Sequence, residues 1–109
     1  MANPYRGEVA ISIDGERRTM RLTLGALCEL EERLESGSLV ALVERFEQGA
    51  VRARDVLALI CAGLRGGGSP VTEAELGAMC IDGGPVVAAQ AAAELLRVTF
   101  ALPGEAGHG

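Results

Sequence analysis

The chain is short and acidic, and both properties limit what it can do. Its 109 residues include 10 basic and 15 acidic side chains, a formal net charge of −5 at pH 7, which disfavours attraction to nucleic acid or to an anionic membrane. No apolar run approaches the roughly 20 residues that a membrane-spanning helix needs, so we expect a soluble, cytoplasmic protein. Because 49% of the residues are hydrophobic but only 3% aromatic, the core must consist of closely packed aliphatic side chains.

A β-hairpin is predicted for residues 8–22. Apolar residues alternate along its first half and are followed at once by Asp14 and Gly15, a pair typical of a two-residue type I′ turn. This turn sets Val9 opposite Met20 and fixes the register of the two strands. The apolar residues that then share one face are Val9, Ile11, Ile13, Met20 and Leu22. Since a lone hairpin is unstable in water, this face should pack on helices.

Helical periodicity and capping residues predict five helices after the hairpin. Thr23 and Ser38 are suited to cap the first two helices, and Thr72 with Glu75 forms a capping box for the fourth. The predicted ranges are about 24–35, 39–48, 53–65, 73–81 and 85–102. The fold class is therefore α+β, mainly α, with an N-terminal β-hairpin packed on a small bundle of about five helices.

The third predicted helix should lie at the centre of this bundle. From Arg54 to Leu64 its large apolar side chains cover most of the helix circumference, and such a helix must be surrounded by other elements. The hairpin and the first, second and fifth helices would cover it. Residues 1–103 would then form a single domain, and residues 104–109 a disordered tail.

The fifth predicted helix has apolar side chains on two flanks. Leu95, Val98 and Leu102 lie on one flank, and Leu96 and Phe100 lie on the other. Either both flanks face the core, or one of them is a docking surface for a partner helix. For the second interpretation, the candidate partner-binding residues are Leu96, Phe100, Ala89 and Ala92.

No set of residues predicts an enzyme, a metal site or a cofactor site. His108 is the only histidine and falls in the predicted tail, so a nucleophile would have no base held beside it. The Gly66–Gly68 run has no phosphate-loop Lys with Ser or Thr after it. Cys28, Cys61 and Cys80 form no CxxC pair, and buried free thiols are predicted for them rather than zinc ligands.

The order of several short motifs along the chain is a further observation. They are Asp14–Gly15 at the hairpin turn, Arg21–Leu27, Glu29–Glu31, Phe46 with Gly49, Asp55–Leu57 and Gly63–Arg65. In this order they resemble the gene transfer agent tail protein family, from the tail gene cluster of phage-like particles of alphaproteobacteria. That family is similar to the tail-assembly chaperones of long-tailed phages. The resemblance covers about residues 4–103.

The resemblance implies a non-enzymatic tail-assembly chaperone of a gene transfer agent or prophage. Such a chaperone binds the tape-measure protein, keeps it soluble in the host cytoplasm and aids assembly of the tail-tube protein. Some members of the family are described as tail-tube proteins, so the alternative is a structural tail or tail-tube component of the particle. The chaperone is favoured because one hairpin is predicted, whereas a tube subunit usually needs a large sheet. A homo-oligomer is left open, and neither nucleic acid nor membrane is expected as a partner.

Overall fold

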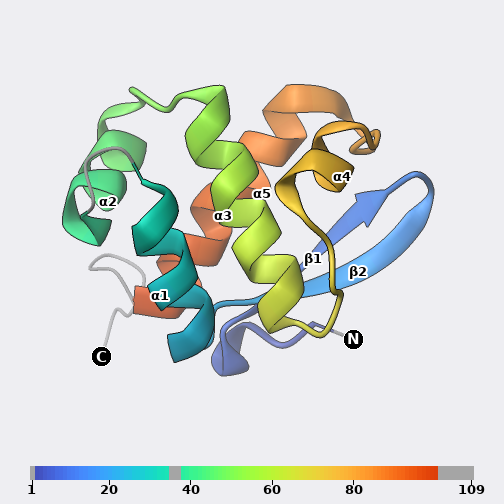
Figure 1. Ribbon diagram of the computed structural model, residues 1–109, viewed down its shortest axis with the longest axis horizontal. Helices are drawn as coiled ribbons and strands as arrows, with labels where there is room; N and C mark the ends of the chain where they lie inside the picture. Colours follow the sequence, from blue (N-terminus) through green and yellow to red (C-terminus); the bar gives the residue numbers. More distant parts are fainter. Residues whose placement is uncertain (1, 35–37, 101–109) are drawn as a thin grey trace.

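The computed structural model describes residues 2–34 and 38–100, in which a two-stranded antiparallel hairpin precedes five α-helices (Figure 1). The elements are the 3-10 helix η1 (Pro4–Arg6), β1 (Glu8–Ile13), β2 (Glu16–Arg21), α1 (Leu24–Arg33), α2 (Leu39–Gln48), α3 (Ala53–Gly66), α4 (Glu73–Gly77) and α5 (Gly84–Phe100). This arrangement confirms the predicted fold class. No helix within the described residues is both long and apolar enough to cross a membrane.

The hairpin has the predicted turn and register. Asp14 and Gly15 have φ angles of 53° and 79°, as a type I′ turn requires, and Val9 pairs with Met20. On the shared face Ile11, Ile13, Met20 and Leu22 are buried and Val9 is half-buried. The alternation of apolar residues and the type I′ turn therefore specify the same strand register. That register directs the apolar face of the hairpin toward the helices.

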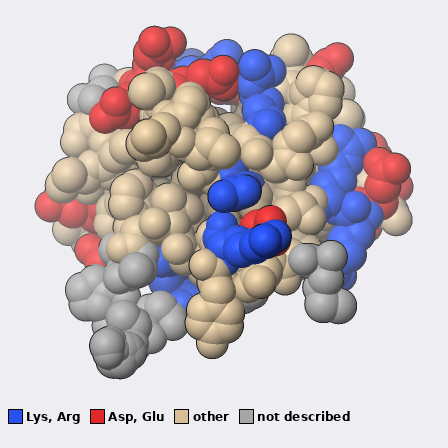
Figure 2. All heavy atoms as spheres, turned by 90° about the horizontal axis from the view of Figure 1, so that it is seen from below, with Lys and Arg blue, Asp and Glu red and all other residues tan. Residues whose placement is uncertain are grey.

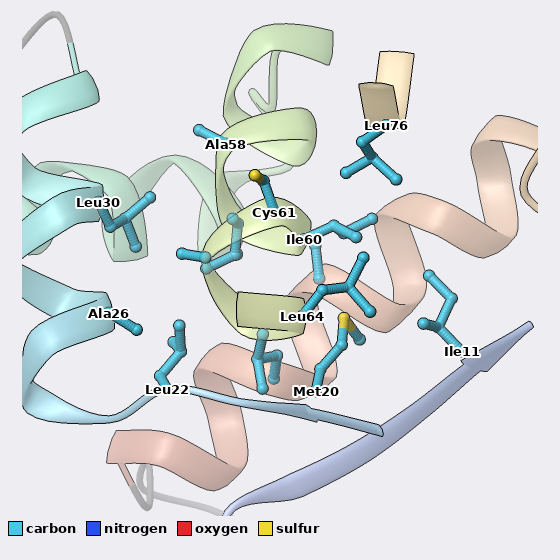
Figure 3. Close-up of a cluster of buried hydrophobic side chains, with 14 of the residues drawn as sticks. Ile11, Met20, Leu22, Ala26, Leu30, Ala58, Ile60, Cys61, Leu64 and Leu76 are labelled. Carbon is cyan, nitrogen blue, oxygen red and sulfur yellow. The ribbon is translucent and has the colours of Figure 1, made fainter. Parts of the chain in front are cut away.

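Helix α3 lies at the centre of the molecule, as predicted, and contacts β2, α1, α4 and α5. Its side chains Ile60, Cys61 and Leu64 point into a cluster that also receives Met20 from β2 and Leu30 from α1 (Figure 3). Helix α2 differs from the prediction, because it makes no extensive contact with α3 along the described residues. It reaches the core through the buried Leu42.

Close approach of α3 to β2 depends on glycines near the end of the helix. A Cβ atom added at Gly66 would lie 1.9 Å from the carbonyl oxygen of Arg21, and one at Gly67 would lie 2.0 Å from that of Thr19. One turn earlier, a Cβ at Gly63 would lie 2.6 Å from Cδ2 of Leu95. The end of α3 can therefore pack directly on the strand backbone only because these positions have no side chain.

The segment after α4 differs from the sequence prediction. The helix was expected to continue to residue 81, but it ends at Gly77, and Ile81 instead forms an antiparallel bridge with Ile13. The N–H of Asp14 donates to the carbonyl of Cys80 at 2.8 Å, and the N–H of Asp82 donates to the carbonyl of Ser12 at 3.0 Å. Pairing with the edge of β1 thus replaces the last helical turn.

Other helix boundaries are close to their predicted positions. Thr23 and Ser38 accept hydrogen bonds from the backbone N–H groups of Ala26 and Ala41, and the predicted capping box at α4 is present. Helix α1 ends at Arg33 rather than near residue 35. The predicted end of the fifth helix at 102 and the predicted tail at 104–109 lie outside the described residues.

Candidate functional site: an apolar groove

An apolar groove of about 640 Å³ lies between the first half of α3, the end of α4 with the segment after it, and the start of α5. This volume is within the range of binding sites in proteins. Its lining residues are Val51, Arg52, Ala53, Val56, Leu57, Ile60, Leu76, Gly77, Met79, Cys80, Ile81, Gly84, Pro85, Ala88 and Ala89. Arg52 is the one charged residue among them, so the groove offers apolar contact and almost no polar chemistry.

The groove exists because α3 and α5 present side chains of unequal size to each other. On the α3 side, Val56 and Leu57 are half-buried beside the fully buried Ile60. On the α5 side, the groove is lined by small residues, among them Ala88 and Ala89. Short side chains on one helix leave the larger ones on the other without a complete set of neighbours, and this leaves apolar surface open to a ligand.

A buried ion pair fixes the corner between α2 and α3, next to one end of the groove. Asp55 is 3% exposed, and its carboxylate accepts two hydrogen bonds from the guanidinium of Arg45, at 3.0 and 2.9 Å. The backbone N–H of Arg52 donates to the same carboxylate at 3.2 Å, and the Arg52 side chain lies 3.7 Å from it. Asp55 lies in the first turn of α3, and through its hydrogen bonds from Arg45 it joins this helix to α2.

Asp55 should make stability depend on acid pH. Burial by itself would raise the pKa of Asp55, but hydrogen bonds from the Arg45 side chain and the Arg52 backbone, with the charges of both arginines, hold it below the ordinary value of 3.8. A carboxylate with a lowered pKa in the folded state stabilises the fold above its unfolded pKa, and this contribution is lost as the pH falls through the folded pKa. We expect the free energy of unfolding to decrease below about pH 4.

The measurement is chemical denaturation at a series of pH values for the wild type and for Asp55→Asn. The decrease below about pH 4 should be smaller in the variant, because its amide does not titrate. Equal pH dependence of the two proteins would show that Asp55 does not contribute to it.

The candidate partner-binding residues do not share one surface. Ala89 lines the groove, and Phe100 is 39% exposed at the end of α5, away from the groove lining. Ala92 and Leu96 are 0% and 1% exposed, so the expectation that they face a partner needs correction. Leu95 on the other predicted flank is also buried, so both flanks of this helix contribute to the core. A partner-binding role for Ala89 and Phe100 stays a prediction.

The cysteines divide into one buried and two exposed thiols. Cys61 is buried as predicted, its Sγ lies 3.4 Å from the carbonyl oxygen of Val71, and burial raises the pKa of its thiol. Cys28 and Cys80 are exposed, which corrects the prediction of three buried thiols: Cys28 lies on the outer side of α1, and Cys80 lies at the groove. Within the described residues no cluster of His, Cys, Asp and Glu could hold a metal ion.

Basic side chains form a strip on the hairpin rather than around the groove. Strand β2 contains Arg17, Arg18 and Arg21, and one group of basic side chains lies toward the right in the view from below, the side on which Figure 1 places the hairpin, while others lie at the centre and top of that view (Figure 2). Arg18 is paired with Glu16 at 2.9 Å. No residue of β2 is among the groove-lining residues, so this basic strip is separate from the apolar groove.

Comparison with known proteins places this mainly helical chain among the proteins of phage tails. A family model described as "Phage tail tube protein, GTA-gp10" matches residues 6–102. Because this match spans nearly the whole chain, the chain belongs to that family. No curated protein and no solved structure matches it. The match confirms the gene transfer agent tail family, whose description names a tail tube protein, while the likeness to tail-assembly chaperones stays a prediction.

Proposed function

We propose that this chain acts in the tail of a phage-like particle, as a structural component of the tail or tail tube. The observation that carries the proposal is the family match over residues 6–102, since the description of that family names the tail tube. An apolar groove without converging polar groups also suits contact with another protein better than catalysis. In this role the chain contacts other tail proteins, and copies of the chain contact one another.

A second candidate function is that of a tail-assembly chaperone. One observation favours it: the strands within the described residues form a single two-stranded sheet, whereas a tube subunit usually needs a larger one. In this role the chain would bind the tape-measure protein in the host cytoplasm, assist tail-tube assembly, and leave before the particle is complete. The apolar groove would cover a helix of the tape-measure protein.

Mass spectrometry of purified particles distinguishes the two functions. A structural component should be recovered with the other tail proteins in particles that have been separated from host lysate, at a comparable copy number. Its absence from such particles, while it is abundant in the lysate, would contradict the structural function.

Co-expression with the matching tape-measure protein supplies the second comparison. A chaperone should raise the soluble fraction of the tape-measure protein and elute with it as a complex, and expression of the tape-measure protein alone is the control. An unchanged soluble fraction without a complex would contradict the chaperone function.

A further inference from the structure

We infer that the edge of β1 around Ala10 binds an extended segment of another tail protein, which adds to the hairpin as a strand in line with residues 80–82. This inference rests on the proposed function, in which the chain contacts other tail proteins. It names the backbone groups that form the contact and the conformation that the partner adopts there.

The backbone of β1 presents every second residue to its outer edge, the edge away from β2. Ser12 points outward, because its carbonyl accepts a hydrogen bond from the N–H of Asp82 at 3.0 Å. Glu8 also points outward, because its N–H donates to the carbonyl of Asn3 at 3.0 Å. Ala10 lies midway between these two residues, so its own N–H and C=O point to the same outer edge.

This stretch of the edge is unpaired. Within residues 2–34 and 38–100, neither the N–H nor the C=O of Ala10 has a hydrogen-bond partner on the outer edge, and the N–H of Ser12 has none. The segment 80–82 stops short of these groups, because the chain turns away at Gly83 and Gly84, whose φ angles are 93° and 81°. Unpaired N–H and C=O groups on a sheet edge are a template for a further strand.

A cavity of about 260 Å³ lies beside the unpaired stretch. Its other wall is on α5, where Val87 and Ala91 lie one helical turn apart and Val87 is 38% exposed. An extended segment suits this space, because its main chain can pair with β1 while alternate side chains contact the helix. The lining residues are Ala10, Ile11, Ser12, Arg17, Asp82, Val87 and Ala91.

The surroundings of the edge favour a single segment of another protein over the hairpin of a second copy. Residues 80–82 already show that this edge accepts an extended segment. Helix α5 contacts β1, so if two copies paired through their β1 edges, each would bring its own α5 to the same space. A single extended segment needs no more room than the cavity beside Ala10 extends along the edge.

Amide hydrogen exchange of the full chain, followed residue by residue by NMR, tests the inference. Short overlapping synthetic peptides that cover the other tail proteins of the same particle are added, with peptides of this chain for comparison. At a concentration about ten times its Kd, a binding peptide should slow exchange of the Ala10 amide about tenfold. Thr19 lies opposite Ala10 and directs its N–H to the far edge of the hairpin, so its unchanged rate is the internal control.

N-methylation of a binding peptide distinguishes strand addition from other modes of binding. A strand pairs with a sheet edge through every second N–H group. Of two versions of the peptide, methylated at alternate residues, one should therefore bind about three- to tenfold more weakly, and the other should bind as the parent does. Both comparisons use the wild-type chain.

Matched variants connect the binding to Ala10. Ala10→Pro removes the outward N–H at a sheet edge, where proline is tolerated, and should weaken binding at least threefold. Ala10→Ser keeps this N–H and should bind as the wild type does. Circular dichroism establishes whether each variant is folded, and the methylated peptides decide the question on the wild type if Ala10→Pro does not fold.

Four results would overturn the inference. They are failure of every peptide to slow exchange at Ala10, equal slowing at Thr19, equal effects of the two methylated versions, and slowing by peptides of this chain alone, which would assign the edge to a second copy. Recovery of the chain in purified particles is independent of these peptides, so the proposed function can hold when this inference fails.

Discussion

Asp55→Asn should lower the free energy of unfolding by about 3 kcal/mol, the lower end of the range for breaking a buried ion pair. The lower end applies because the Arg45 side chain is 18% exposed. Water can therefore partly hydrate its guanidinium group when the ion pair is broken. The substitution removes the negative charge that Arg45 contacts through two hydrogen bonds and leaves the shape of the side chain almost unchanged. Urea denaturation at neutral pH measures the effect.

The control for this prediction is an exposed ion pair in the same protein. Arg33 lies 2.9 Å from Glu73, with side chains that are 51% and 28% exposed. Arg33→Gln should change stability by about 0.5 kcal/mol or less, because exposed pairs are well hydrated when broken. If Asp55→Asn were no more destabilising than Arg33→Gln, the pair at the α2–α3 corner would not stabilise the fold.

Gly66→Ala should destabilise the protein by about 3 kcal/mol through overpacking. The added methyl group would meet the carbonyl oxygen of Arg21 at 1.9 Å, and backbone of a paired strand cannot move aside as a flexible side chain can. For a domain of this size, the loss corresponds to a decrease in Tm of about 15 °C. Thermal unfolding followed by circular dichroism measures it.

Gly77→Ala is the matched control. A Cβ atom at Gly77 would have nothing within 4 Å, and alanine is favoured over glycine in a helix by roughly 1 kcal/mol. We therefore expect unchanged or slightly increased stability. A Gly66→Ala protein as stable as Gly77→Ala would show that α3 and β2 can separate at little cost.

The parts of the fold that the sequence predicts correctly depend on local chemistry. Asp14 and Gly15 define the turn because few other pairs accept positive φ at both positions, and Thr23, Ser38 and Thr72 cap helices through bonds to residues three positions away. The pairing of residues 80–82 with β1 is missed, because it joins segments more than sixty residues apart. No local pattern encodes such a contact.

The candidate site is less predictable, because periodicity shows which side chains are apolar but not which neighbour covers them. Ala89 was included among the predicted partner-binding residues and lines the groove, while Leu96 is covered by the core. The groove forms where small residues at the start of α5 face larger ones on α3. Which faces of the two helices meet is set by the tertiary structure and cannot be read from the sequence of either helix. The pairing of Arg45 with Asp55 also depends on how the segment between α2 and α3 places the two helices.

The bridge between Ile13 and Ile81 has a consequence for synthesis of the protein on the ribosome. Although the hairpin is made first, one edge of β1 receives its partners only when residues 80–82 have been translated, and its apolar face also contacts α5. An isolated hairpin is at best marginally stable. The contacts of β2 with α3 can form once that helix has emerged, but the edge of β1 and its side against α5 are completed only after most of the chain has been translated, so the core closes in a late step that depends on contacts distant in sequence.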